Sequence, residues 1–308
     1  MPDSYAVDLR GKAAVVTGSG RGLGLAYALA LARAGAGVVV NDVDEAAAEQ
    51  AVKTITQAGG RAVAEVAAVG TGEAADRLVA RAVEEFGRLD VMVTNAGILR
   101  DRVLWKMTDD DFDAVVTTHL RGTFTCARAA AVRMREQGEG GSLILVGSPA
   151  GQRGNFGQTN YAAAKAGIAA MVRTWSMELA RADITVNAIV PVAATAMTET
   201  IPAFAPYIEA MKEGQPLPDF LRKGEGFGTA DDCAALVPFL ASGYARDVTG
   251  QCVGIGGDRL ALWSHPQEAS VAYADGGWTP ETIAAAWHTS VGSAPEPVGI
   301  PAPKILGA

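Results

Sequence analysis

Three residues in the middle of the chain have types and a spacing that could move a proton. Tyr161 and Lys165 stand four positions apart in "GNFGQTNYAAAKAG", and Ser148 precedes the tyrosine by thirteen positions. Residues four apart lie on one face of a helix, so the ammonium would favour the ionised form of the phenol. A tyrosine, whose ordinary pKa is about 10, would then become a usable base near neutral pH. For an isolated pair with this spacing, the alternative is a packed tyrosine and a solvated lysine.

Strand-like and helical segments alternate along the chain around these residues. Runs rich in apolar β-branched residues occur at 13–17, 37–41, 61–66, 90–94, 142–147, 184–190 and 251–255. Helical patterns occupy 22–34, 44–58, 71–86, 109–136, 158–180 and 229–242. Strands that are apolar throughout are typical of a parallel sheet covered by helices on both faces. The alternation therefore predicts an α/β fold with a doubly wound parallel sheet of seven strands.

Domain boundaries follow from breaks in this alternation. We expect one domain over residues 1–258, because no Pro- or Ser-rich linker interrupts the pattern. Within it, residues 195–228 hold several prolines and a loose amphipathic pattern, which suits a mobile lid beside a pocket. Residues 259–308 form a C-terminal extension with a Pro-rich end. Its tryptophans predict that the extension packs on this domain or on a neighbouring subunit.

A glycine-rich segment after the first predicted strand indicates a phosphate-binding turn. Gly18, Gly22 and Gly24 lie between the strand and the first helix with the spacing G-x-x-x-G-x-G. Glycine permits a tight turn and close approach of the backbone, and a helix N-terminus offers free N–H groups to a pyrophosphate. We therefore expect a dinucleotide to contact this turn, including its residues Arg21 and Leu23.

Residues beside the turn favour NAD over NADP as that dinucleotide. Asp42 ends the second predicted strand, where its carboxylate could accept both ribose hydroxyls and would repel a 2′-phosphate. Arg21 favours NADP, since a basic side chain there could meet that phosphate; a solvated turn residue is the alternative. Asn95, Ala96 and Gly97 follow the fourth predicted strand, where small residues let a ligand cross the end of the sheet.

Together these motifs resemble the short-chain dehydrogenase/reductase family. The glycine turn, Asp42, "NAG", Ser148, "YAAAK" and "NAIVP" occur in the order and spacing of that family over residues 10–257. The resemblance implies a single-domain Rossmann fold and a nicotinamide-dependent oxidoreductase that interconverts a secondary alcohol and a ketone. It implies Tyr161 as general acid/base, Ser148 as the ligand of the substrate oxygen, and Tyr161 and Lys165 as cofactor contacts. Lys165 and the positive nicotinamide ring would together lower the tyrosine pKa.

Three further positions acquire expected roles from the same resemblance. Pro191 and Thr195 stand where the family contacts the cofactor, and the Thr195 hydroxyl suits the nicotinamide carboxamide. His119 occupies the place where the family usually has an asparagine that anchors a water in a proton relay. An imidazole can also hold a water and pass protons. A histidine that only caps or packs the helix is the alternative.

Several segments resemble one subgroup, the (3R)-hydroxyacyl-CoA dehydrogenase domain of multifunctional β-oxidation enzymes. They are "VVVNDVD", "NAGILRDR", "HLRGTF", "GNFGQTNYAAAK" and "GGWTPETIAAAW". The resemblance implies oxidation of a 3-hydroxyacyl-CoA-type substrate with NAD in fatty acid metabolism. Three alternatives stay open: an NADPH-dependent 3-oxoacyl reductase, a steroid or other alcohol dehydrogenase, and a non-catalytic dinucleotide-binding regulator.

Composition argues against several other classes of protein. The net charge is −8 and the pI is about 5.0, so the surface as a whole would repel nucleic acid and anionic lipid. Cys126, Cys233 and Cys252 have no paired spacing, and the histidines are too few for a zinc cluster, so we expect no metal. No apolar run approaches the roughly 18 residues of a membrane span. We therefore expect a cytoplasmic homodimer or homotetramer, paired through Ala-rich helices at 109–136 and 158–180.

Overall fold

Seven apolar runs form the parallel strands of one sheet, which confirms the predicted α/β class. The computed structural model describes residues 6–194 and 205–300 of the chain. The parallel strands are β1 (Ala13–Val16), β2 (Gly37–Asp42), β3 (Arg61–Val66), β4 (Val91–Thr94), β5 (Gly141–Val146), β6 (Ile184–Pro191) and β7 (Cys252–Gly256). Their order in the sheet is β3-β2-β1-β4-β5-β6-β7. The order reverses between β1 and β4, and in such sheets ligands bind at the carboxyl ends beside that reversal.

An eighth strand, β8 (Arg259–Trp263), corrects the predicted strand number and the predicted end of the sheet. It pairs antiparallel with β7, so that Cys252 lies opposite Trp263. Trp263 packs against the buried cluster on one face of the sheet. The sequence "RLALW" had been expected to belong to the extension, because a five-residue edge strand is too short to show a clear period. The sheet therefore continues five residues beyond the predicted domain boundary at 258.

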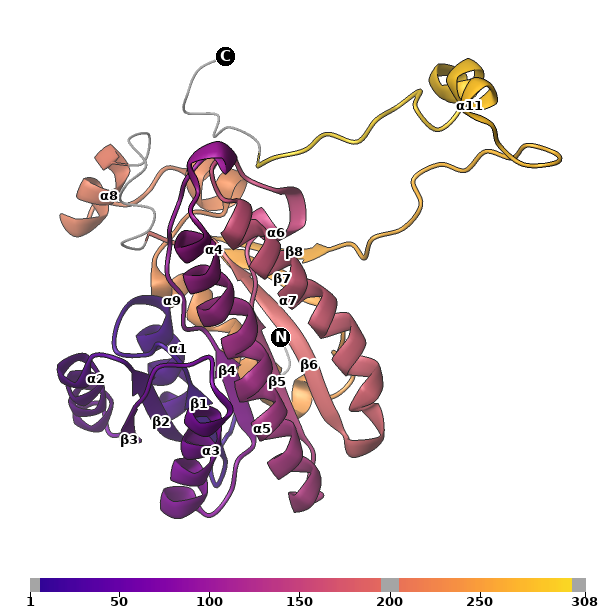
Figure 1. The fold of residues 1–308 in the computed structure, drawn as a ribbon. Coiled ribbons are helices and arrows are strands. Elements are labelled where there is room, and N and C mark those ends of the chain that lie inside the picture. Colours follow the sequence, from indigo (N-terminus) through magenta and orange to yellow (C-terminus); the bar gives the residue numbers. More distant parts are fainter. Residues whose placement is uncertain (1–5, 195–204, 301–308) are drawn as a thin grey trace.

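Helices cover both faces of the sheet (Figure 1). One buried cluster joins the sheet to α1 (Gly22–Arg33), α2 (Glu45–Gln57), α9 (Ala230–Ala234) and α10 (Leu236–Leu240). The other cluster joins it to α3 (Gly72–Phe86), α5 (Gly122–Gln137) and α7 (Thr159–Glu178). Apolar side chains on both faces explain why the strands are apolar throughout.

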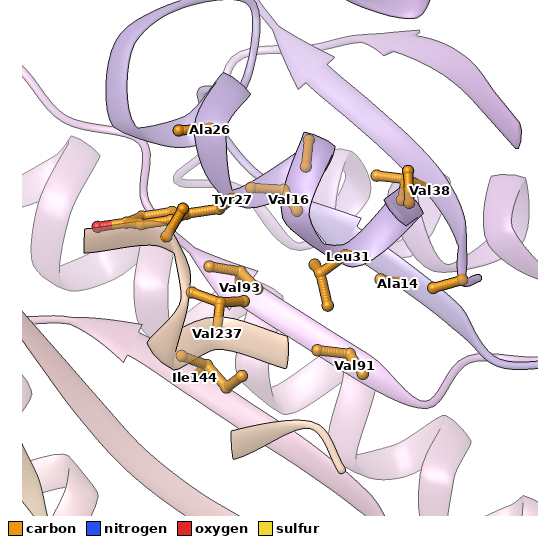
Figure 2. Packing of buried hydrophobic residues seen from close by; sticks show 14 of the residues in the cluster. Ala14, Val16, Ala26, Tyr27, Leu31, Val38, Val91, Val93, Ile144 and Val237 are labelled. Carbon is orange, nitrogen blue, oxygen red and sulfur yellow. The ribbon is translucent and has the colours of Figure 1, made fainter. Parts of the chain in front are cut away.

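The first cluster fixes α1 against the centre of the sheet. Tyr27 and Leu31 of α1 are fully buried over Val16 of β1, with Ile144 of β5 and Val237 of α10 close by (Figure 2). Close-packed interiors hold neighbouring elements in one arrangement. The N-terminus of α1, with its glycine turn, is therefore held rigidly at the carboxyl end of β1.

The helix predicted over 109–136 is present but contains an irregular turn. It consists of α4 (Asp109–Val116), a π-helical turn (Thr117–Arg121) and α5. Thr108 caps α4 with a complete capping box, which explains where the helix begins. Turns of the π type within α-helices are frequently found at functional sites. This one contains His119, whose side chain is buried.

The predicted lid is described only in part, because residues 195–204 lie outside the described residues. Its described part contains α8 (Ala205–Lys212) and a second π-helical turn (Phe220–Glu225). Ile208, Leu221 and Phe227 form a small buried cluster of their own. A lid function for this segment stays a prediction.

The C-terminal extension leaves the body of the protein after β8 and carries α11 (Pro280–Ala286) at its far end (Figure 1). Trp278 and Trp287 are 42% and 47% exposed there. The chain then returns to α6 (Pro149–Arg153), where the Gly299 N–H donates to the Arg153 carbonyl at 2.7 Å. The Arg153 Nε donates in turn to the Gly299 carbonyl at 2.9 Å. Packing of the extension on a neighbouring subunit stays a prediction.

Candidate active site

The structure brings Ser148, Tyr161 and Lys165 together at the carboxyl end of β5. Ser148 follows β5 and caps α6, where its Oγ accepts a hydrogen bond from the Ala150 N–H at 3.2 Å. The Ser148 hydroxyl also lies close enough to the Tyr161 hydroxyl to lower the pKa of that phenol. Tyr161 and Lys165 lie one turn apart on α7, and the Lys165 Nζ is 5.6 Å from the centre of the tyrosine ring. This arrangement is compatible with proton transfer through the phenol.

Lys165 is a buried cation with a single backbone acceptor among the described residues. Its Nζ donates to the Val146 carbonyl at 2.6 Å. Burial lowers the pKa of Lys165 from 10.5 to about 7, because a low-dielectric interior disfavours the charged form. Gly151 of α6 permits this burial, since a Cβ there would lie 2.5 Å from the Lys165 backbone.

Burial dominates the ionisation of Tyr161 as well. It raises the tyrosine pKa above 10, the Ser148 hydroxyl lowers it, and the nearby Asp101 carboxylate raises it. The prediction that Lys165 and a bound nicotinamide ring together lower this pKa concerns the cofactor-bound protein and stays a prediction. In the protein alone, the Lys165 Nζ lies over the tyrosine ring and donates to the Val146 carbonyl. A positive charge on a bound molecule would lower the tyrosine pKa further.

His119 packs beside Tyr161. The two rings lie edge to face, with centres 5.1 Å apart and an angle of 87°. The His119 Nε2 lies 2.8 Å from the Ile98 carbonyl oxygen and 3.1 Å from the Ile98 nitrogen. Its Nδ1 is buried and has no hydrogen-bond partner among the described residues. Burial, and secondarily the Lys165 charge, lower the His119 pKa to about 3, so the ring is neutral near pH 7.

Gly97 has a packing role that sequence reasoning missed. A Cβ at this position would lie 2.1 Å from the His119 Cε1. No real contact is that short, so any other residue here would displace the imidazole. Gly97 was predicted from its place after the fourth strand as a cofactor contact. The structure shows that it also makes room for His119.

The glycine turn has the shape and the free donors that a phosphate group requires. A Cβ on Gly18 would lie 2.7 Å from the Ala96 Cα, and one on Gly24 would lie 2.1 Å from the Gly18 carbonyl oxygen. Gly22 has a φ of +57° and, among the described residues, has no atom within 4 Å of an added Cβ. At Arg21 the described residues provide no side-chain cap for α1. The first N–H groups of α1 are therefore free for an anion.

Asn95 holds the glycine turn against β4. Its Nδ2 donates to the carbonyls of Thr17 and Gly18 at 3.1 and 2.9 Å. The Thr17 Oγ1 accepts from the N–H groups of Asn95 and Ala96 at 3.0 and 3.1 Å. Sequence reasoning did not select Thr17, because its partners follow a strand that is adjacent only in the folded sheet.

Asp42 and Arg21 lie on the same side of the turn. Asp42 is buried at the end of β2, and its Oδ2 accepts from the Gly20 N–H at 3.0 Å. Arg21 is solvent-exposed and its Nη2 lies 3.6 Å from the Asp44 Oδ2. The Asp42 carboxylate is thus held by a backbone hydrogen bond, whereas the Arg21 guanidinium is exposed beside the Asp44 carboxylate.

The remaining predicted cofactor residues occupy different environments. Leu23 is partly buried and packs on the core beneath the glycine turn. Pro191 ends β6 opposite Ile255 of β7, also at the carboxyl edge of the sheet. Thr195 lies outside the described residues.

Asn160 is a further structural residue of this site that sequence reasoning missed. It is fully buried, and its Nδ2 donates to the carbonyls of Arg100 and Asp111 at 3.1 and 2.9 Å. Its Oδ1 accepts from the Tyr161 N–H at 2.8 Å. Asn160 thereby ties the loop after β4 and the start of α4 to the start of α7. Its partners are distant in sequence, so the sequence contains no local signal for this role.

A family comparison decides the class of the protein. The family model described as enoyl-(acyl carrier protein) reductase, a model of short-chain dehydrogenases, matches residues 18–257. The chain belongs to the short-chain dehydrogenase/reductase family. The site residues therefore belong to an oxidoreductase that acts on hydroxyl or keto groups, and members of this family bind a nicotinamide dinucleotide. The glycine turn, the free α1 donors and the Asp42 carboxylate fit such a molecule.

Individual members of the short-chain dehydrogenase/reductase family confirm the predicted subgroup resemblance. The chain is 42% identical over 291 residues to the hydroxyacyl-CoA dehydrogenase ChsB1 of Mycobacterium tuberculosis, covering 90% of this chain and 88% of that protein. It is 44% identical over 200 residues to the Drosophila melanogaster peroxisomal multifunctional enzyme type 2, covering 62% of this chain and 33% of that protein. A short-chain dehydrogenase structure from Mycobacterium avium matches with a TM-score of 0.80 and 34% identity, covering 96% and 99% of the two chains.

Proposed function

We propose that the protein is an NAD-dependent dehydrogenase that interconverts a 3-hydroxyacyl-CoA-type alcohol and its ketone. The observation that carries the proposal is the cluster of Ser148, Tyr161 and Lys165 beside a glycine turn with a fixed Asp42 carboxylate. The similarity to a protein named hydroxyacyl-CoA dehydrogenase supports the substrate class. The preference for NAD rests on the charge of Asp42.

The side chains of the cluster divide the proton chemistry among them. When bound, the nicotinamide ring supplies the acceptor for hydride. The Tyr161 phenol oxygen takes the proton of the substrate hydroxyl during oxidation and returns it during reduction. Ser148 donates a hydrogen bond to the substrate oxygen and keeps it beside Tyr161. Lys165 binds the nicotinamide ribose and, when protonated, favours the ionised phenol.

For His119 we propose the relay role, with the imidazole holding a water molecule through its unpartnered Nδ1. A buried polar atom without a protein partner is a common binding point for an ordered water. The second observation is Lys165, which lies close enough for its charge to lower the pKa of His119. Since the imidazole is neutral near pH 7, it holds the water and does not itself carry the proton.

Replacing His119 tests the relay role against simple packing. His119→Phe keeps an aromatic ring against Tyr161, but removes both nitrogens, so we expect kcat to fall about tenfold to a hundredfold. His119→Asn restores polar atoms at this position and is expected to recover most of the turnover. Steady-state kinetics measure both, and thermal unfolding shows that the variants are folded. Full turnover in a folded Phe variant would show that His119 only packs the helix.

A cofactor and substrate screen tests the proposed function directly. We expect NAD reduction with 3-hydroxyacyl-CoA substrates, and lower or no turnover with steroids and simple alcohols. We also expect kcat/KM for NAD to exceed that for NADP at least about tenfold, and Asp42→Ala to remove most of the difference. A preference for NADP in the unmutated protein would contradict the role of Asp42. Absence of hydroxyacyl-CoA turnover would contradict the substrate class.

A second candidate is an NADPH-dependent 3-oxoacyl reductase. A 38% identity over 250 residues to a protein named 3-oxoacyl-[acyl-carrier-protein] reductase, and the position of Arg21 in the turn, favour it. The same screen, run with NADPH and 3-oxoacyl substrates, separates it from the leading proposal. Either activity would set aside a non-catalytic dinucleotide-binding regulator, which has no use for an assembled acid/base.

For the whole chain we propose a cytoplasmic homodimer or homotetramer in which the C-terminal extension packs on a second copy. Among the described residues, no helix is long and apolar enough to cross a membrane. The exposed faces of Trp278, Ile283 and Trp287 support the contact, since large exposed apolar patches mark interaction sites. The apolar pocket between these side chains could also receive an apolar side chain of a second copy.

The tryptophans of the extension provide the test of this assembly. We expect the double variant Trp278→Ser, Trp287→Ser to weaken self-association at least about tenfold, because buried tryptophans dominate interface energies. Light scattering over a range of protein concentrations measures the mass. An unchanged mass at all concentrations would place these side chains outside any interface between copies.

A further inference from the structure

The loop after β2 and the glycine turn form one hydrogen-bonded unit. The Asp42 Oδ2 accepts from the Gly20 N–H at 3.0 Å, and the Asp42 Oδ1 accepts from the Asp44 N–H at 3.2 Å. The glycine turn also packs closely against this loop and the start of α2. A Cβ on Gly20 would lie 2.8 Å from both the Asp42 Oδ2 and the Ala47 Cβ, so only glycine fits here without a shift. Asp42, Asp44 and Arg21 therefore hold fixed positions relative to one another at the level of the backbone.

Asp44 has two contacts, one with each of its carboxylate oxygens. The Oδ1 caps α2 by accepting from the Ala47 N–H at 3.2 Å. The Oδ2 lies 3.6 Å from the Arg21 Nη2, and the two side chains are 45% and 75% exposed. An ion pair this exposed contributes little to folding stability. The relevant effect of the ion pair is on position, because it draws the Arg21 guanidinium toward the Asp44 carboxylate.

The charges around the Asp42 carboxylate disfavour a phosphate on the adenosine ribose. Asp42 and Asp44 are both negative, and the positive Arg21 is drawn toward Asp44. A ribose phosphate carries nearly two negative charges near pH 7. A guanidinium without a carboxylate neighbour would instead pair with a phosphate in bidentate fashion.

We propose that Asp44 is a second determinant of cofactor identity, which keeps Arg21 away from a 2′-phosphate and adds a like charge beside it. Asp44 is a positioning residue in this role, because it acts largely through Arg21. The inference rests on the proposed NAD-dependent function, in which Asp42 binds the ribose hydroxyls. It explains how a chain with an arginine in its glycine turn would still select NAD.

The test is a double-mutant cycle read by direct binding of NAD and NADP to the full chain. Asp44→Asn removes the charge but keeps an oxygen that can cap α2. We expect it to tighten NADP binding about fivefold while the Kd for NAD changes less than about twofold. Adding Arg21→Gln is expected to reverse most of that gain. Calorimetry measures the binding constants, and the ratio of kcat/KM values for the two cofactors should follow them.

A matched control separates this effect from the net charge of the protein. Asp8→Asn makes the same charge change in an exposed pair with Arg10, which precedes β1 and so lies at the opposite end of that strand. Its NADP affinity is expected to stay unchanged. Unaltered NADP affinity in Asp44→Asn, or a gain that persists without Arg21, would overturn the inference. A wild-type protein that prefers NADP would contradict the proposed function instead.

Discussion

Replacing Tyr161 by phenylalanine is expected to lower kcat by about a thousandfold and to change the Kd for NAD less than about twofold. Phenylalanine keeps the ring that packs edge to face against His119 and lies under Lys165. It removes only the phenol oxygen, the atom that we propose takes the substrate proton. Steady-state NADH formation measures turnover, and calorimetry measures cofactor binding.

A control for the Tyr161 experiment is Tyr244→Phe, which removes the same atom from a half-exposed tyrosine in the turn Gly243–Ala245. Its turnover is expected to match that of the unmutated protein. Substantial turnover in a folded Tyr161→Phe variant would refute the acid/base mechanism. Loss of NAD binding in the same variant would show that the Tyr161 hydroxyl supports the cofactor site. The lost turnover could then not be assigned to proton transfer.

Replacing Lys165 by methionine is expected to abolish turnover and to stabilise the fold. The lysine is fully buried and donates one hydrogen bond, to the Val146 carbonyl. Methionine fills a similar volume without placing a charge in the interior. The gain in the free energy of unfolding is expected to be about 1–2 kcal/mol near pH 7, after the loss of the bond to Val146. Thermal unfolding measures the stability, and NADH formation measures the turnover.

The stability difference for Lys165→Met depends on pH with a defined sign. The pKa of Lys165 is about 7 in the folded protein against 10.5 ordinarily, so between these values the unfolded chain binds more protons. Stability of the unmutated protein therefore rises from about pH 7 to 10.5, and the full cost of the buried charge is present below pH 7. The advantage of methionine is thus expected to be largest below pH 7 and to shrink above it.

Lys12→Met is the matched control for Lys165→Met. Lys12 is partly exposed, and its Nζ bonds to the Asp90 carboxylate at 2.9 Å. Its replacement is expected to lower stability, because the buried Asp90 loses a partner. A lower or equal melting temperature for Lys165→Met at pH 6 would show that the lysine charge is compensated in the folded protein.

Sequence reasoning succeeded where a local pattern determines the structure. The seven parallel strands follow from continuous apolar runs, and the approach of Tyr161 and Lys165 follows from the helical period. Both features depend on residues close together in sequence. The same local reasoning placed Gly18 and Gly24 in a tight turn between a strand and a helix, and steric contacts show why only glycine fits there.

The features that sequence reasoning missed depend on contacts between distant segments. Burial by the whole fold raises the Tyr161 pKa, an effect that the spacing to Lys165 does not reveal. Asn160 is held by carbonyls 60 and 49 positions away. The strand β8 forms because β7 offers it a free edge. None of these partners can be identified from a single local window of the sequence.

If copies of the chain associate through the C-terminal extension, the return of the extension to Arg153 would connect this association to Ser148. Ser148 caps the start of helix α6, and Arg153 ends it. Two hydrogen bonds join Arg153 to Gly299 of the extension. Ordering an extended segment costs conformational entropy that a docking surface has to offset. A second copy that orders residues 264–298 would therefore bias the position of α6 and, through it, of Ser148. Linkage is reciprocal. If association between copies raises the affinity for a ligand that fixes Ser148, that ligand would raise the affinity between copies by the same factor.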